Sequence, residues 1–298
     1  MASCARPAAS KEEVLEGISV RHEAYGRKMP LASYQAARLA SRREHRATPW
    51  VLDRGDGTIV ATLLCYELDL ALDAGVYRAY GLGSVGTRVA HRRQGHAAAL
   101  CRAACEASEA AGRSVGLLFS GIAPTYYERL GFRVSSASAC RCERLPELCD
   151  SGPAATLAPF DPRRDLARIT GDYVAFHRGT LHMHRDRRRF LESIEDGVDD
   201  WFFRIEGADR GYLRLAKYAD GTLGVVEPIV LDPALEAPAI RAAARLALAH
   251  GLKGVSGWYD PPLAVSAWFT PQPRDEDRPM LRGAPPHASA RFWGSDHF

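Results

Sequence analysis

One stretch of the chain constrains its fold more than any other. An apolar strand pattern at 85–89 runs into the basic turn Arg92-Arg93-Gln94, then into Gly95 and an alanine-rich helical stretch. The first turn of a helix has unpaired backbone N–H groups and the positive end of the helix dipole, so it binds anions such as a pyrophosphate. Cations in that turn are unfavourable for the helix alone, and a bound anion would explain them.

Helix and strand patterns occur in two rounds along the chain. The first round predicts helices over 12–47, strands at 50–52, 58–65 and 76–89, a helix at 93–111, a strand at 114–119, a short helix at 125–130 and a strand at 132–142. The second round predicts helices at 166–177, 187–195 and 238–250 and strands at 201–205, 211–217, 223–231 and 254–258. Asp56-Gly57 is a strong hairpin signal between two of these strands. The order predicts an α/β chain with a mixed sheet flanked by helices in each half.

The two rounds are separated by a stretch with turn-forming residues. Residues 146–159 include Asp150-Ser151-Gly152-Pro153, which is typical of a linker. We therefore expect two domains, at 1–148 and 149–298. After residue 261 the chain is rich in proline and charge, and Phe292-Trp293 is expected to be a late apolar anchor.

Composition places the chain among ordinary globular proteins. Its 39 basic and 36 acidic residues give a net charge of +3, which indicates neither nucleic acid nor a membrane as a partner. We find no run of about 18 apolar residues, and the beginning of the sequence lacks the apolar core of a signal peptide. The seven cysteines have no regular spacing, so we expect free, buried thiols, no metal site and a cytoplasmic protein.

Two motifs resemble those of a known family. Arg92-x-x-Gly95-x-Ala97 after a strand resembles the coenzyme A signature of the GNAT acetyltransferases. The run from Tyr126 to Phe132 resembles a second motif of that family, Tyr-x-x-x-Gly-Phe. The resemblance covers roughly residues 12–145. It implies a GNAT fold in which two parallel strands splay apart, with acetyl-CoA as cosubstrate. It also implies that a primary amine attacks the thioester directly.

The resemblance also implies roles for individual residues. Tyr127 would be the general acid, because it lies four positions before Gly131. The implied acetyl-CoA-binding residues are Val85, Gly86, Thr87, Arg92, Arg93, Gln94, Gly95, His96, Ala97, Ala98 and Ser120.

For several side chains the sequence leaves both a functional and a structural role open. Tyr127 could instead be core packing, and His96 could be a phosphate neighbour or a solvent-exposed residue. Glu67, Asp69 and Glu227 could bind a substrate ammonium, although a structural role is the default for each. The histidines of 182–184 lie in a polar stretch and are expected to be solvated.

The second half lacks the anion-binding pattern of the first. Its corresponding helix start, residues 232–238, has acidic residues but no glycine or arginine, so we expect one cofactor site per chain. A GNAT domain followed by a degenerate GNAT-like half resembles the enhanced-intracellular-survival acetyltransferases and the fungal lysine N6-acetyltransferases. In the first group the terminal carboxylate can serve in the active site, which makes Phe298 a catalytic candidate here.

The function expected from these features is acetyl transfer from acetyl-CoA to a primary amine of a small molecule or of a lysine side chain. The alternative is a catalytically inactive acyl-CoA-binding or sensor module.

Overall fold

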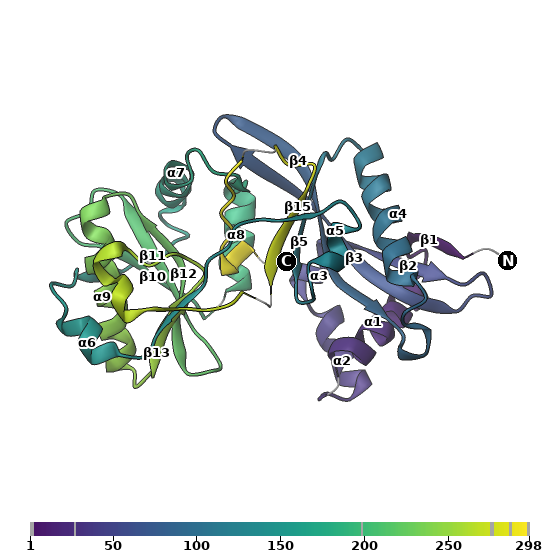
Figure 1. The fold of residues 1–298 in the computed structure, drawn as a ribbon, viewed down its shortest axis with the longest axis horizontal. Coiled ribbons are helices and arrows are strands. Elements are labelled where there is room, and N and C mark those ends of the chain that lie inside the picture. Colours follow the sequence, from purple (N-terminus) through teal and green to yellow (C-terminus); the bar gives the residue numbers. More distant parts are fainter. Residues whose placement is uncertain (1–2, 27, 198, 275–276, 286–287, 297–298) are drawn as a thin grey trace.

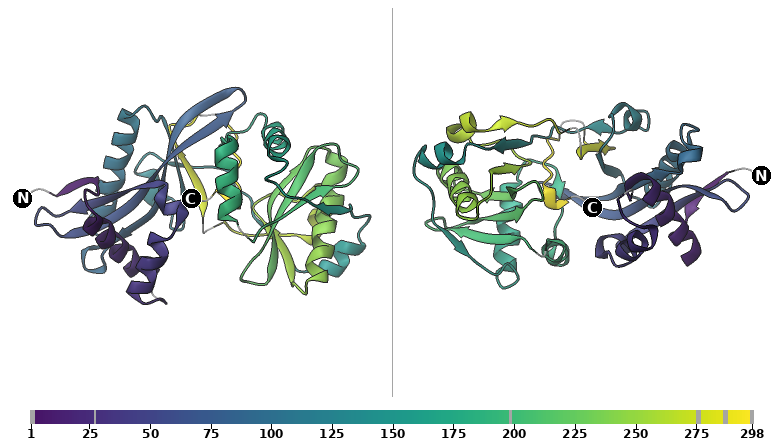
Figure 2. Two further views of the ribbon diagram at one scale, coloured as in Figure 1. Left: turned by 180° about the vertical axis from the view of Figure 1, so that it is seen from behind. Right: turned by 90° about the horizontal axis from the view of Figure 1, so that it is seen from below.

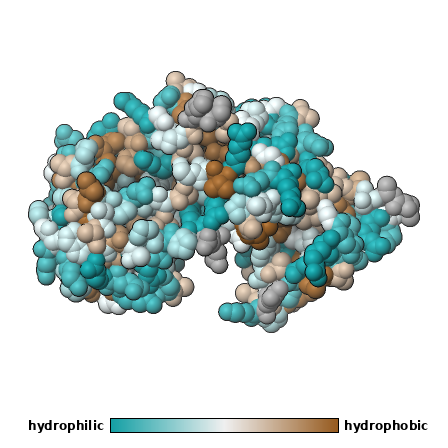
Figure 3. All heavy atoms as spheres, viewed as in Figure 1, coloured by the Kyte–Doolittle hydropathy of each residue, from teal (hydrophilic) through white to brown (hydrophobic). Residues whose placement is uncertain are grey.

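Two mixed β-sheets, each flanked by helices, form two lobes that lie side by side (Figures 1 and 2). The computed structural model describes residues 3–26, 28–197, 199–274, 277–285 and 288–296. No helix among these residues is long and apolar enough to cross a membrane. Figure 3 shows a notch between the lobes at the lower edge of the molecule.

The first sheet is built mainly from the amino-terminal half. Its strands are, in spatial order, β1 (Cys4–Pro7), β2 (Ala47–Asp53), β3 (Ile59–Leu72), β4 (Gly75–Thr87), β5 (Val115–Ser120), β15 (Arg278–Arg282) and β6 (Arg133–Val134), and β9 (His182–Met183) pairs with β3 off this path. β4 and β5 are parallel, and the other pairs are antiparallel. β2 and β3 form the predicted hairpin, in which Gly57 has a φ of +84° that favours glycine.

Helices cover both faces of this sheet (Figure 1). They are α1 (Lys11–Tyr25), α2 (Leu31–Leu39), α3 (Arg42–His45), α4 (His96–Ala110) and α5 (Thr125–Glu128). α4 buries one stripe, Leu100, Cys101, Ala104 and Cys105, in a core that includes Leu63 and Leu82 of the sheet. α1 begins at the Ser10 cap and packs on β3.

The second sheet is also mixed, with one pair of parallel strands among antiparallel ones in the described part of the chain. Its strands are, in spatial order, β14 (Thr270–Pro271), β7 (Cys140–Cys142), β13 (Gly254–Gly257), β12 (Thr222–Val230), β11 (Gly211–Lys217), β10 (Trp201–Ile205) and β8 (Leu157–Pro159). β12 and β13 are the parallel pair. The helices of this lobe are α6 (Leu145–Asp150), α7 (Leu166–Phe176), α8 (Arg187–Asp196) and α9 (Pro233–Ala249).

The two sheets exchange strands. β15 comes from the carboxyl-terminal part of the chain and lies between β5 and β6 of the first sheet, where its yellow colour stands out in Figure 1. β7 precedes residue 148 and lies between β13 and β14 of the second sheet. Neither sheet is therefore confined to one side of residue 148, and the division at 148/149 stays a prediction about function rather than a boundary between sheets.

Further contacts join the lobes. Arg46 on the first lobe pairs with Glu192 of α8 at 3.2 Å and also with Asp196, and Arg42 pairs with Glu195 at 2.6 Å. Phe292 and Trp293 are 4% and 2% exposed, which confirms the predicted apolar anchor.

The structure corrects four sequence expectations. β1 was not predicted, because its short sequence has no strand period. The expected strand at 132–142 is wrong: it is divided into β6 and β7, which belong to different sheets because β15 occupies the place beside β5. The expected linker at 146–159 contains most of α6 and all of β8. The helical region ends at His45, since β2 already begins at Ala47.

The cysteines agree with the expectation of free thiols. All seven are free, and six are buried, whereas Cys4 is exposed. Within the described part of the chain no group of three metal-ligating side chains comes together.

Candidate active site

The parallel strands β4 and β5 separate part-way along their length. Their pairing ends at Leu82 opposite Leu118. Beyond this point β4 continues to Thr87, while Phe119 and Ser120 of β5 pair with β15 on their other side. Among the described residues, stretch 83–87 of β4 therefore has no partner strand on the side of β5. We call the space between the two diverging strands the slot.

β4 contains a bulge beside the slot. Gly83 lies opposite Leu64 of β3 and Gly86 lies opposite Thr62, so β4 has one residue more than β3 over this interval. Ser84 has a φ of +52°, which is uncommon for a residue with a side chain. The bulge turns the backbone at Val85 out of the regular ladder.

Tyr25 is a residue of the slot that the sequence did not single out. Its hydroxyl donates a hydrogen bond of 2.6 Å to the carbonyl oxygen of Val85. Although Tyr25 is 59% exposed, the partial loss of solvent around its hydroxyl is the main cause that raises its pKa, and the Arg21 and Arg92 side chains partly oppose it. Tyr25 is the last residue of α1, far from Val85 in sequence, and no local pattern connects the two.

The turn between β4 and α4 has the features expected of an anion site. Gly95 is the N-cap of α4 with a φ of +82°, and Arg93 also has a positive φ of +61°. No side chain caps α4, and its first turn contains no acidic residue. A Cβ atom built on Gly95 would meet nothing within 4 Å, so the space above the helix start is open. Its N–H groups and dipole therefore face solvent beside exposed cations.

The side chains of this turn are mostly free to meet a ligand. Arg92 donates from Nε to the carbonyl oxygen of Thr87 at 3.2 Å. Arg93 has no hydrogen bond or ion pair with any described residue. His96 contacts the amide oxygen of Gln94 at 3.3 Å. These residues, together with Ala97 and Ala98, are at least partly exposed around one helix end.

Tyr127 lies on α5 and belongs to the core cluster that contains Leu82 of β4 and Leu118 of β5. Its side chain is 8% exposed and packs edge-on against Tyr126 and Phe132. Burial raises the pKa of Tyr127 far above its ordinary value, and Cys101 and Tyr25 act in the same direction. The hydroxyl has no hydrogen-bond partner in the described part of the chain. It is therefore a protonated group close to Tyr25.

Gly86 and Ser120, two further residues predicted to bind acetyl-CoA, are both buried. Gly86 is buried under α1, where a Cβ would lie 3.7 Å from the Cα atom of Arg21, an ordinary contact. Ser120 is 1% exposed, and its hydroxyl donates to the carbonyl oxygen of Ile122 at 2.9 Å and accepts from the N–H of Ile122 at 3.3 Å. The Ser120 side chain thus stabilises the turn after β5, and its role toward acetyl-CoA stays a prediction.

The three candidate carboxylates differ in their environment. Glu227 is fully buried; it accepts from Arg185 at 2.7 Å, from Tyr212 at 2.7 Å and from Ser295 at 2.5 Å. Against the opposing effect of burial, Arg185 and Arg214 hold the pKa of Glu227 well below its ordinary value. Glu227 is therefore a structural ion that a substrate ammonium cannot reach.

The other two carboxylates lie at the surface between the lobes. Glu67 pairs with Arg113. Asp69 lines a small cavity of about 80 Å³ between β3 and α8. Among the three candidates, Asp69 alone lines a cavity between the lobes.

The histidines at 182 and 184 were expected to be solvated, and for His182 this is wrong. His182 is 3% exposed and stacks on His177 with ring centroids 4.7 Å apart. It is buried because β9 adds to the edge of β3, opposite Ala71. Phe298 lies outside the described residues, so its catalytic role stays a prediction.

Comparison with known proteins agrees with this geometry. Residues 6–135 match the family model of the acetyltransferase (GNAT) domain. No curated protein matches the chain. The splayed parallel strands and the uncapped helix start lie within the matched residues, so this part of the chain is similar to a GNAT acetyltransferase domain.

Solved structures extend the likeness to both lobes. A GCN5-related N-acetyltransferase from Kribbella flavida has a TM-score of 0.68 and 17% identity, covering 94% of this chain and 71% of its own. A GCN5-related N-acetyltransferase from Anabaena variabilis has a TM-score of 0.68 and 14% identity over 94% and 72%. Eis1 from Mycobacterium abscessus has a TM-score of 0.62 and 16% identity over 94% and 73%. At these identities the likeness shows the fold: a tandem arrangement of two GNAT-like lobes.

Proposed function

We propose that this protein transfers an acetyl group from acetyl-CoA to a primary amine, of a small molecule or of a lysine side chain, in the slot between β4 and β5. The proposal rests on three features that occur together. The edge of β4 beyond Leu82 is unpaired on the side of β5, and the start of α4, which follows β4, is uncapped. Tyr127, a buried and protonated tyrosine, belongs to the same core cluster.

The residues of the first lobe fit the parts of acetyl-CoA. In this proposal the N–H groups at the start of α4, with Arg92 and Arg93, bind the pyrophosphate. The free edge of β4 at Val85 and Thr87 pairs with the amides of the pantetheine arm. The Val85 carbonyl oxygen accepts from Tyr25, and its second lone pair can accept another donor, so an amide could share it or replace the tyrosine.

Bound acetyl-CoA would supply a thioester whose acetyl carbon the amine attacks, with formation of a C–N bond and cleavage of the C–S bond. The chain's own residues would hold the reactants together and manage protons. A tyrosine is protonated at neutral pH, and burial raises the pKa of Tyr127 further. Its Oη could then donate this proton to the sulfur of the leaving group.

The second lobe would form one wall of the acceptor site. Phe119, the residue before Ser120 at the end of β5, has its ring centroid 6.1 Å from that of Trp258 and 6.2 Å from that of Phe292. The second lobe thus reaches the end of the strand beside which the slot opens. Its own helix start at 232–238 is acidic, and we propose one acetyl-CoA per chain.

Tyr127→Phe tests this proposal, with Tyr126→Phe as the matched control one position away. The assay is release of thiol from acetyl-CoA with a panel of primary amines. Tyr127→Phe should lower kcat by about 10²–10⁴-fold, because it removes one general acid. The Kd for acetyl-CoA should change little, and Tyr126→Phe should leave kcat near that of the wild type.

Three results would count against the proposal. An unchanged kcat in Tyr127→Phe would make this residue part of the core only. An equal loss in Tyr126→Phe would point to damaged packing. Binding of acetyl-CoA without thiol release for any amine would favour the inactive binding module.

A further inference from the structure

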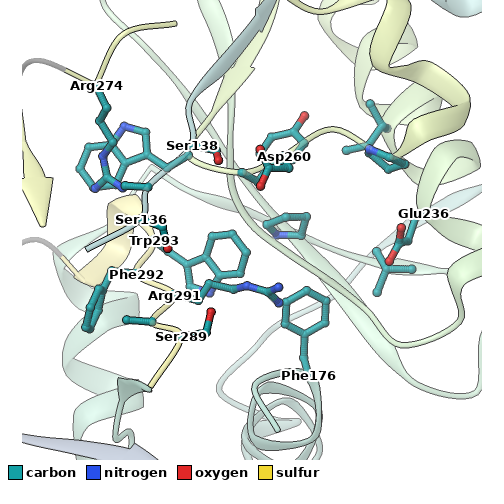
Figure 4. A pocket seen from close by; sticks show the side chains of 18 residues that line it. Ser136, Ser138, Phe176, Glu236, Asp260, Arg274, Ser289, Arg291, Phe292 and Trp293 are labelled. Atoms are coloured by element: carbon teal, nitrogen blue, oxygen red, sulfur yellow. The ribbon is translucent and has the colours of Figure 1, made fainter. Parts of the chain in front are cut away.

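The second sheet has its own separation between parallel strands, and a cavity lies there. Pairing of β12 with β13 ends at Val225 opposite Gly257, while β12 continues to Val230. A cavity of about 330 Å³ opens beyond this point. It is lined by Val230, by Trp258 just after β13, and by the carboxyl-terminal segment 289–293 (Figure 4).

This cavity is unsuited to coenzyme A. Asp232 caps α9, its carboxylate accepting from the N–H of Ala234 at 2.9 Å, and Glu236 lies in the first helical turn. A pyrophosphate would meet these two acids instead of free N–H groups. Pro228 on β12 has no N–H to pair with a pantetheine carbonyl. A ligand of the second cavity must therefore have a different chemistry.

Arg274 is the residue that points to a ligand. It is 8% exposed, and its guanidinium carbon lies 3.7 Å from the centroid of the Trp258 ring. Its Nε and Nη2 atoms are buried and have no hydrogen-bond partner among the described residues. Buried donors without partners cost free energy, and the described part of the chain supplies no acceptor for these two. Nε–H and Nη2–H together form the fork that matches the two oxygens of a carboxylate.

The other charges around the cavity limit the charge of a ligand. Arg274 and Arg291 contribute two positive charges, and Glu236 and Asp260 contribute two negative ones, so the formal sum is zero. An anionic ligand with one charge changes this sum by one and a dianion changes it by two, so among anions a monoanion disturbs the balance least. Burial lowers the pKa of Arg274 to about 10, so the guanidinium still carries its charge at neutral pH.

Aromatic rings form much of the remaining wall. Figure 4 shows Arg291, Trp293 and Phe176 around the lower part of the cavity, with Arg274 at its other side. The guanidinium carbon of Arg291 lies 4.9 Å from the centroid of the Phe176 ring. The volume of 330 Å³ corresponds to about eleven water molecules at roughly 30 Å³ each, which suits a one- or two-ring molecule.

We infer that this cavity binds a small monocarboxylate with a flat apolar body, the carboxylate on the Nε–Nη2 edge of Arg274 and the body against the aromatic wall. Trp258 and Phe292 line this cavity and also contact Phe119 at the end of β5, so the two sites adjoin, but binding of a carboxylate to Arg274 does not depend on the proposed acetyl transfer.

The test uses the full chain with phenylacetate and indole-3-acetate as probes. Phenylacetamide is the neutral analogue of the first probe, and inorganic phosphate is the anion without an apolar body. Isothermal titration should show saturable binding of at least one carboxylate and none of phenylacetamide or phosphate. Arg274→Met should weaken that binding roughly 10- to 100-fold, the range for hydrogen bonds to a charged group. Arg164→Met, at an exposed arginine of the same lobe, is the matched control and should bind as the wild type does.

Thermal unfolding separates a binding role from a structural one. Arg274→Met removes two buried N–H donors that have no acceptor among the described residues, and the methionine side chain can still pack on Trp258, so the melting temperature without ligand should stay the same or rise. The inference is overturned if neither carboxylate binds the wild type, if phenylacetamide or phosphate binds as well, or if Arg274→Met keeps the affinity. Competition by acetyl-CoA would also overturn it, because the probe would then occupy the first lobe. Should Arg274→Met not fold, the wild-type comparison of phenylacetate with phenylacetamide still decides.

Discussion

Acid should destabilise this protein through His177, which is fully buried between α7 and the carboxyl-terminal segment. Its Nε2 atom accepts a hydrogen bond of 2.9 Å from the indole N–H of Trp293. Since an indole N–H can only donate, the imidazole proton sits on Nδ1, which donates to the carbonyl oxygen of Tyr173 at 2.8 Å. A second proton, on Nε2, would face the Trp293 N–H and break the contact that anchors the segment.

The size of the effect follows from the pKa of His177. Burial lowers it to about 3, and His182 and Arg291 act in the same direction. An unfolded histidine has a pKa of about 6.5, so below that pH the unfolded state binds a proton that the native state does not. Stability therefore falls as the pH falls, by about 1.4 kcal/mol per pH unit. From about pH 7.5 to 4.5 the loss from this one residue is roughly 2.7 kcal/mol, and above pH 7 it is absent.

Urea unfolding of the wild type and of His177→Gln over this pH range measures the effect. The glutamine oxygen can accept from Trp293 and is never protonated, so the variant should lose less stability on acidification. The difference in unfolding free energy between the two proteins should shift by roughly 2–3 kcal/mol in favour of the variant at the lower pH. His250→Gln, at an exposed histidine, is the control. Parallel pH profiles for the wild type and His177→Gln would refute the reasoning.

Two further predictions concern the cofactor turn and the buried ions. Wild-type protein should bind one acetyl-CoA per chain in calorimetry, and Gly95→Asp should bind none, because it places a carboxylate on the open helix start; retained affinity, or two molecules per wild-type chain, would contradict the assignment. Glu227→Gln should destabilise the chain by about 3–5 kcal/mol in urea, since Arg185 and Arg214 lose a buried counter-ion. The exposed ion-pair variant Glu195→Gln should cost less than about 1 kcal/mol, and equal losses for the two would argue against this account.

Local periodicity was sufficient to predict most of the helices and strands. The apolar stripe of α4 and the Asp56-Gly57 turn are set by neighbours a few residues apart, so the sequence shows them directly. Strand exchange is different. Whether β15 or the stretch after Phe132 lies beside β5 depends on a partner about 160 residues away from β5, and no local pattern contains that information.

The residues of the candidate site differ in the same way: some belong to local patterns, and others depend on contacts between distant segments. The helix start at Gly95 was predictable, because its physics is local, whereas Tyr127 was singled out by the resemblance to a family motif and its role stays a prediction. Tyr25 was missed, since its hydroxyl meets Val85 only after α1 has packed on the sheet. The buried position of Glu227 was also not decidable from sequence, because its partners Arg185 and Ser295 come from other elements.

The second cavity shows why a degenerate motif is a poor guide to whether a cleft is in use. At 232–238 the sequence lacks the glycine and the cations of a phosphate site, and the structure agrees that the start of α9 is capped and acidic. The cations that line the second cavity are instead Arg274 and Arg291, which lie on the segments before and after the exchanged strand β15. The segments that accompany the exchanged strand thus determine the charges beside the separation between β12 and β13. If Arg274 is kept at a cost in stability, the second lobe has retained a cleft and changed the ligand that the cleft recognises.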